Sequence, residues 1–219
     1  MGRWQPDARG RLEQAALDLF AEQGFEATTV PQITARAGLT TRTFFRYFAD
    51  KREVLFAGED SVPAQVAQLL ADAPPSLGAM DLIADRLGGA AEAVFEGRSV
   101  DYLQRRRAVV DAEPALYERE LRKFALLSQA LDQGFRERGV DELTARLTAE
   151  IAVTAFRIGA GRWIAQGGAS SLPDTIDDTL AAMRNLTNGL ATDKGTAPVR
   201  AGSDLGAGGP GDIKTKESR

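Results

Sequence analysis

The sequence contains no cysteine and no histidine. Without cysteine there can be no disulfide, no thiolate metal site and no cysteine nucleophile. Without histidine the chain lacks the commonest general base and the commonest zinc ligand, and a Ser-His-Asp hydrolase is impossible. An enzyme could still use carboxylates, Lys or Tyr, but the absence of cysteine and histidine argues against one. We expect a protein that is not an enzyme, and we assign no catalytic residue, no metal ligand and no cofactor.

Long apolar runs are also missing. No stretch approaches the roughly 20 apolar residues that a membrane-spanning helix needs. The first ten residues, MGRWQPDARG, lack the apolar core of a signal peptide. We expect a cytoplasmic protein without a membrane partner. Because Leu and Ala are frequent and β-branched runs are scarce, the composition favours an all-α fold.

The charge is unevenly distributed. The whole chain carries 27 basic and 31 acidic side chains, a net charge of −4, which argues against a wholly basic nucleic-acid binder. Residues 1–52 instead hold eight basic and six acidic side chains, about +2. The positive end of the molecule is therefore its N-terminal part.

Three short helices are predicted at the N-terminus. Residues 9–23 have apolar side chains at i, i+3, i+4, i+7 and i+8, the pattern of an amphipathic helix that Gly24 ends. Thr29 is the expected N-cap of a second helix, with Pro31 in its first turn and Gly38 at its end. This spacing, with a tight glycine turn before the next helix, is typical of a helix-turn-helix.

Thr40 is the expected N-cap of the third helix, and Asp50 that of a fourth, where Glu53 would complete a capping box. Large rings are an efficient filling for so small a core. The expected buried side of the third helix consists of Phe44, Phe45 and Phe48.

Four segments in this order, GFEATTV, ITARAG, TTRTFFRYF and DKREVL, resemble the N-terminal domain of TetR-family transcriptional regulators. The resemblance covers about a quarter of the chain, and the remainder matches only in its helical style and length. It implies a homodimer in which each protomer carries a helix-turn-helix on a larger helical domain that binds a small molecule. The unliganded dimer would block transcription from a palindromic operator, and ligand would change the spacing of its two reading heads.

The helix from Thr41 would enter the major groove of double-stranded DNA, where Arg42 can make a bidentate contact to guanine. Lys51, in the first turn of the fourth helix, matches a family lysine that contacts phosphate, although a plain surface cation is the alternative. Phe45 lacks the hydroxyl of the family's usual tyrosine and is expected to act as a packing ring. The predicted DNA contacts are Thr29, Thr40, Thr41, Arg42, Thr43, Arg46, Tyr47 and Lys51.

The rest of the chain predicts long helices, broken at PPSLG (74–78) and starting again near Pro114, Asp141 and Ser171. We expect a DNA-binding domain over 1–52 and a ligand-binding and dimerisation domain over 53–192. Glycine and proline with few apolar anchors predict a disordered tail over 193–219.

Candidate ligand contacts in the second domain are aromatic or apolar, with one cation. Arg157 lies among apolar residues, so we expect it to be buried against an internal carboxylate or, as the alternative, an anionic ligand. Arg105, Arg106 and Arg107 are expected in solvent, with an anion-docking site as the alternative. Small residues at 152–161 suggest a dimer interface or tight packing within one protomer. The predicted ligand contacts are Tyr102, Phe124, Leu127, Phe156 and Arg157.

The sequence thus predicts a ligand-responsive, DNA-binding repressor. One alternative is a small-molecule carrier or enzyme whose N-terminal helices are only structural. Another is a protein that organises DNA and senses no ligand.

Overall fold

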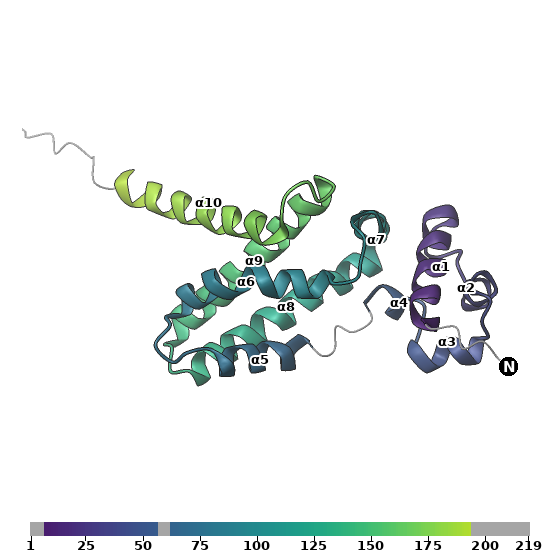
Figure 1. Cartoon of the computed structure of the whole chain (residues 1–219), viewed down its shortest axis with the longest axis horizontal. Helices are drawn as coiled ribbons and strands as arrows, with labels where there is room; N and C mark the ends of the chain where they lie inside the picture. The colour runs from purple at the N-terminus through teal and green to yellow at the C-terminus, as the bar shows by residue number, and fades with distance from the viewer. Residues whose placement is uncertain (1–6, 57–61, 194–219) are drawn as a thin grey trace, which may run out of the picture. The chain divides into compact units, whose positions relative to one another are not determined.

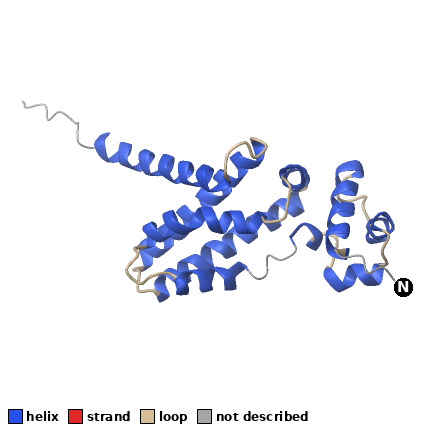
Figure 2. Ribbon diagram, viewed as in Figure 1, coloured by secondary structure: helices blue, strands red, loops and turns tan. Residues whose placement is uncertain are grey.

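The structure, a computed structural model, describes residues 7–56 and 62–193. These ranges are helical with short connections and contain no strand, which confirms the all-α fold (Figures 1 and 2). The helices are α1 Ala8–Gln23, α2 Val30–Ala37, α3 Thr41–Tyr47, α4 Glu53–Phe56, α5 Val62–Asp72, α6 Ala79–Phe95, α7 Val100–Ala112, α8 Pro114–Glu137, α9 Glu142–Ala165 and α10 Leu172–Asp193.

The described residues up to Met183 form one compact unit, and the end of α10 from Arg184 belongs to a second. The tail predicted from residue 193 lies outside the described residues except for Asp193, which ends α10. Within the described ranges, no helix has the length and apolar character that crossing a membrane requires.

The predicted helix ends at the N-terminus are confirmed. Thr29 caps α2 in a reciprocal capping box with Gln32, and the Thr40 hydroxyl accepts a hydrogen bond from the backbone N–H of Thr43 at 3.2 Å. Gly38 ends α2 with φ 63°, a left-handed conformation that glycine adopts without steric cost. The side chain of Arg11 in α1 donates to the carbonyl of Ala37, so α1 holds this turn in place.

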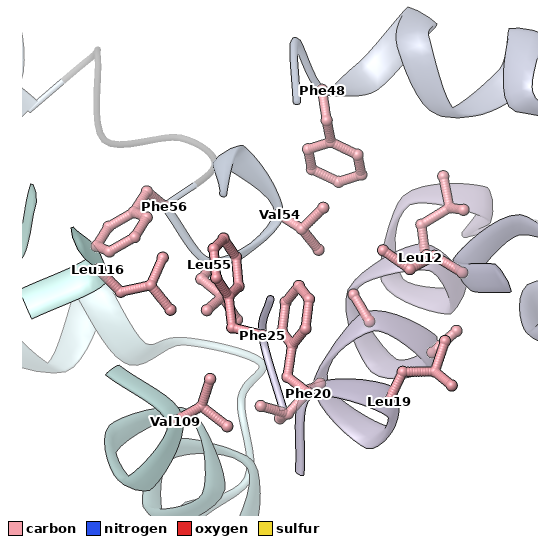
Figure 3. Close-up of a cluster of buried hydrophobic side chains, with 14 of the residues drawn as sticks. Leu12, Leu19, Phe20, Phe25, Phe48, Val54, Leu55, Phe56, Val109 and Leu116 are labelled. Atoms are coloured by element: carbon pink, nitrogen blue, oxygen red, sulfur yellow. The ribbon is translucent and has the colours of Figure 1, made fainter. Parts of the chain in front are cut away.

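The N-terminal helices share one hydrophobic cluster with the middle of the chain. Phe44 of α3 and Phe48, which directly follows α3, are 0% and 2% exposed, and their ring centroids lie 5.4 Å apart. Figure 3 shows Phe56 and Leu55 of α4 beside Leu116 of α8, with Val109 of α7 on the same side. The core of the first three helices is therefore continuous with α4, α7 and α8.

The expectation that Phe45 is buried is wrong. Its side chain is 59% exposed and touches the edge of the Phe44 ring, with the centroids 5.4 Å apart. Residues four apart share a helix face, as Phe44 and Phe48 do, whereas a neighbouring residue is turned by about 100°. Phe45 is therefore turned away from the buried face.

A second hydrophobic cluster joins α5, α6, α8, α9 and α10. Ala152 and Ala155 of α9 are fully buried, and a Cβ at Gly159 would lie 3.2 Å from the Cα of Ile176 in α10. These small residues are used where helices of one chain approach closely. Of the two interpretations of residues 152–161, the structure favours packing within a protomer.

Candidate nucleic-acid interface and ligand cavity

The N-terminal end of α3 presents polar side chains to solvent. Thr41 and Arg42 are exposed, whereas the hydroxyls of Thr40 and Thr43 lie 3.0 Å apart and hydrogen bond to each other. Within the described ranges, Arg42 has no side-chain hydrogen bond or ion pair with another residue. A guanidinium with all its donors free, on a helix held from behind by Phe44, is a group that can bind a base edge.

Phe45, Arg46 and Tyr47 extend this exposed surface. Arg46 Nη2 donates a hydrogen bond to the Tyr47 hydroxyl at 2.9 Å, and its guanidinium lies 4.7 Å from the centre of the Tyr47 ring. Phe45 follows Thr41 by four positions and Arg42 by three, so the three residues share one face of α3. The one-residue offset from Phe44 is the sequence signal that would have placed Phe45 here.

Lys51 forms structural hydrogen bonds that the sequence did not predict. Its ammonium donates to the backbone carbonyls of Phe25 at 2.8 Å, Glu26 at 3.2 Å and Thr28 at 3.2 Å. It also lies 4.3 Å from the centre of the Phe25 ring. Since an ammonium has three donors, all three are used to fasten the connection between α1 and α2. A phosphate contact by Lys51 stays a prediction, and it would have to replace one of these bonds.

The helix-terminus argument for Lys51 is wrong, because Lys51 and Arg52 lie in a turn before α4 begins at Glu53. Asp50 accepts the predicted bond from the backbone N–H of Glu53 at 3.1 Å, but it does not directly precede α4, which begins at Glu53. The Glu53 carboxylate does not complete the capping box, since it forms an ion pair with Arg119 of α8 at 2.6 Å.

Arginines of α7 and α8 join the N-terminal helices to the rest of the unit. Arg105 forms an ion pair with Asp18 of α1, and Arg106 Nε donates to the carbonyl of Leu55 at 2.9 Å. The guanidiniums of Arg106 and Arg119 each lie 5.1 Å from the centre of the Phe56 ring. The expectation of solvated side chains is therefore wrong for Arg105 and Arg106, whose partners come from distant segments of the chain.

Glu120 of α8 sits between two cations. Its carboxylate is 3.2 Å from Arg106 Nη1 and 3.1 Å from Lys123 Nζ. Burial alone would raise the pKa of Glu120, but the two charges and their hydrogen bonds outweigh it and lower the pKa below its ordinary value of 4.5. Glu120 is therefore ionised at neutral pH and holds both cations.

A cavity of about 830 Å³ opens beside this ion-paired group. Arg106, Glu120 and Lys123 line it, together with rings from three helices: Phe95 of α6, Phe124 of α8 and Phe156 of α9. Phe95 and Phe156 are stacked with centroids 6.0 Å apart, and Phe124 is 6.3 Å from Phe156. The volume of this cavity falls within the range of small-molecule pockets.

Four of the five predicted ligand residues line this cavity: Phe124, Leu127, Phe156 and Arg157. Tyr102 is misplaced, because it packs against the N-terminal hydrophobic cluster, where burial raises its pKa. Arg157 is exposed rather than buried against an internal carboxylate, so the predicted environment of this side chain is wrong. Across residues 7–56 and 62–193, no three Asp or Glu side chains lie close enough together to hold a metal ion.

Comparison with known proteins places this architecture in a family. Residues 13–57 match the family model described as bacterial regulatory proteins, tetR family. The HTH-type transcriptional repressor Rv3405c of Mycobacterium tuberculosis is 32% identical over 147 residues, which cover 60% of this chain and 77% of that protein. The chain belongs to the TetR family of bacterial regulatory proteins. It is therefore a helix-turn-helix transcriptional regulator, and these relatives do not favour the carrier or enzyme alternative.

Solved structures of TetR-family regulators share the fold. The SmeT–triclosan complex has a TM-score of 0.55 at 20% identity, over 80% of this chain and 90% of SmeT. NalD, the secondary repressor of the MexAB-OprM multidrug efflux pump in Pseudomonas aeruginosa, has a TM-score of 0.54 at 17% identity, over 82% and 95% of the two chains. At this identity the likeness extends to the fold and carries no ligand across.

Proposed function

We propose that this TetR-family chain is a repressor that binds a palindromic operator as a homodimer and leaves it when a small molecule fills the cavity. The observation that carries the proposal is the free guanidinium of Arg42 on the exposed face of α3, whose opposite face is anchored by Phe44. Residues 1–52 would form the DNA-binding domain and residues 53–192 the sensing and dimerisation domain.

In the proposed complex α3 lies in the major groove. Arg42 makes the bidentate contact to guanine, and the exposed ring of Phe45 packs against a thymine methyl group, the apolar contact available there. Polar groups around them bind phosphates and set the register of the helix. These groups are Thr29, Thr40, Thr41, Thr43, Arg46 and Tyr47.

The proposed dimer uses an apolar stripe on α9. Leu143, Leu147 and Ile158 are 68%, 53% and 43% exposed and recur on one side of that helix. Covering such a stripe with the same stripe of a second copy gives a two-fold symmetric interface. A two-fold dimer places its two α3 helices on half-sites about one helical turn, roughly 10 base pairs, apart.

The proposed release uses Arg106. This side chain lines the cavity and also donates to Leu55 and lies against Phe56, both in α4. A ligand that draws Arg106 towards the cavity weakens its hold on α4, which is the segment that leads back to α3. The large cavity also argues against a protein that only organises DNA.

The operator is tested by selection from a random duplex library. The wild-type chain should enrich palindromes with half-sites about one turn apart. Each protomer of Arg42→Ala should lose a contact worth about 1–3 kcal/mol, which is about fivefold or more in affinity for each contact. Arg122→Ala, which removes an exposed arginine of α8, is the matched control and should bind normally. Unchanged binding of Arg42→Ala, or enrichment of no sequence by the wild type, would refute the proposal.

A further inference from the structure

The charge of the cavity is opposite to that of the chain. The whole chain has a net charge of −4. Seven cationic side chains but only two carboxylates line the cavity, a formal balance of +5. The cationic side chains are Arg9, Arg98, Arg106, Arg107, Lys123, Arg157 and Arg162, and the carboxylates are Asp111 and Glu120.

Three of these cations, Arg98, Arg157 and Arg162, have no carboxylate partner in the part of the chain that the structure describes. Arg98, which follows α6, and Arg157 of α9 are exposed, and neither forms an ion pair or side-chain hydrogen bond inside the described ranges. Arg9 and Arg107, in contrast, pair with Glu13 and Asp111 four residues further along their own helices. Arg162 of α9 donates only to the neutral hydroxyl of Thr179, at 3.5 Å. The unpaired positive charge of the cavity therefore lies on Arg98, Arg157 and Arg162, and the first two also lack a side-chain hydrogen bond.

The two carboxylates are already engaged. Glu120 is shared by Arg106 and Lys123, and Asp111 accepts from Arg107 Nε at 3.2 Å. A cationic ligand would have to displace these partners and would also meet the remaining positive charge. An anionic ligand meets no such opposition, since charge-assisted hydrogen bonds from guanidinium groups favour carboxylates and phosphates.

The apolar part of the wall is flat and aromatic. Two rings of the lining, Phe95 and Phe156, are nearly parallel, with centroids 6.0 Å apart and an angle of 18° between their planes. Behind the lining, Trp163 is also nearly parallel to Phe95, at 6.2 Å and 14°. Phe124 and Leu127 add further apolar surface to the lining. Such a wall favours a planar hydrocarbon body, which can stack in parallel with Phe95 and Phe156.

We propose that the effector is an amphipathic organic anion, in which a flat aromatic body lies against Phe95, Phe124 and Phe156 while Arg98 and Arg157 hold its anionic group. This assignment rests on the proposed ligand response, because it names the chemistry of the molecule that fills the same cavity. Arg106 is a further guanidinium of the lining and would connect the bound anion to α4.

Three fluorescent probes with one ring system test the charge requirement: 1-pyrenebutyrate, 1-pyrenebutanol and 1-pyrenebutylammonium. Their binding to the full chain is measured without DNA, by anisotropy at low ionic strength. We expect the carboxylate to bind at least tenfold more tightly than the alcohol, and the ammonium to bind most weakly. Arg98→Gln with Arg157→Gln should bring the carboxylate to the level of the alcohol, whereas Arg122→Gln should leave the preference unchanged.

The outcomes separate this assignment from the proposed function. Equal binding of the three probes, a preference that survives the double variant, or no binding of any probe would overturn the anionic class. None of these results bears on operator binding, which the duplex selection with Arg42→Ala tests on its own. A wild-type chain that selects no operator but still prefers the carboxylate would instead refute the repressor and retain the anion site.

Discussion

The N-terminal helices and the helices around the cavity use aromatic rings in opposite ways. Phe44, Phe48 and Phe56 are at most 2% exposed and fill the first hydrophobic cluster. Phe95, Phe124 and Phe156 are half-buried and line about 830 Å³ of open volume. A filled core holds α3 rigid, so that its function lies on its surface, whereas an incompletely filled core leaves room for function inside.

The largest expected effect comes from emptying the filled core. Phe44→Ala removes a ring with no exposed surface and should cost about 3–5 kcal/mol in the free energy of unfolding, because it loses the ring's burial and leaves a cavity. Phe45→Ala, one residue away but 59% exposed, should cost less than about 1 kcal/mol. Urea unfolding measures both.

The same pair separates stability from DNA binding. Phe45→Ala should remain folded and yet lose affinity for duplexes in which a thymine methyl faces α3. If Phe44→Ala were as stable as the wild type, the N-terminal cluster would not be the rigid support described above.

The next largest loss of stability should come from breaking the contacts of Arg106, which connect α4 to the helices around the cavity. Arg106→Gln removes the bond to the Leu55 carbonyl and one partner of the half-buried Glu120 carboxylate, which should cost about 1–3 kcal/mol. Arg107→Gln is the neighbouring control. Its ion pair with Asp111 is exposed and should contribute under about 0.5 kcal/mol. If thermal unfolding showed the same loss of stability for both variants, the contacts of Arg106 would stabilise the fold no more than an exposed ion pair does.

Lys51→Met tests whether this lysine is structural. The substitution keeps the length of the side chain but removes three bonds to backbone carbonyls, so we expect a loss of roughly 1–2 kcal/mol. The amides of residues 25–29 should also exchange hydrogen faster. Arg52→Met, which breaks an exposed pair with Asp50, should leave that exchange unchanged. If the amides of residues 25–29 exchanged as slowly in Lys51→Met as in the wild type, the lysine would not be structural. Its ammonium would then be available for the predicted phosphate contact.

The smallest effect is the pH dependence contributed by Glu120. A carboxyl whose pKa is lower in the folded than in the unfolded chain stabilises the fold above its unfolded pKa, and this contribution is lost as the pH falls through the folded pKa. The wild-type free energy of unfolding should therefore decline below about pH 4.5, the ordinary value for Glu, through this group. Glu120→Gln should be less stable at pH 7 and show a weaker acid decline. An unchanged decline would exclude Glu120 as its source.

Much of the helix-turn-helix could be predicted from the sequence because its signals are local. Thr29, Thr40, Gly38 and Asp50 each act within a few residues along the chain, where capping and turn chemistry are decided. The same locality explains why the starts of α8 and α9 were predicted correctly. Phe45 was expected on the wrong face because the prediction grouped three nearby rings and ignored its one-residue offset from Phe44, which turns it by about 100° around the helix.

Composition and spacing determined that this chain is helical, that it begins with a helix-turn-helix and that Arg42 lies at the exposed start of α3. Tertiary packing decided that Lys51 binds three carbonyls, that Arg106 connects α4 to the cavity, and that Arg157 faces solvent and not an internal carboxylate. The backbone carbonyls that Lys51 and Arg106 bind lie 23 to 51 residues away in the sequence. Such contacts depend on how helices are brought together, and no local pattern in the chain records that arrangement.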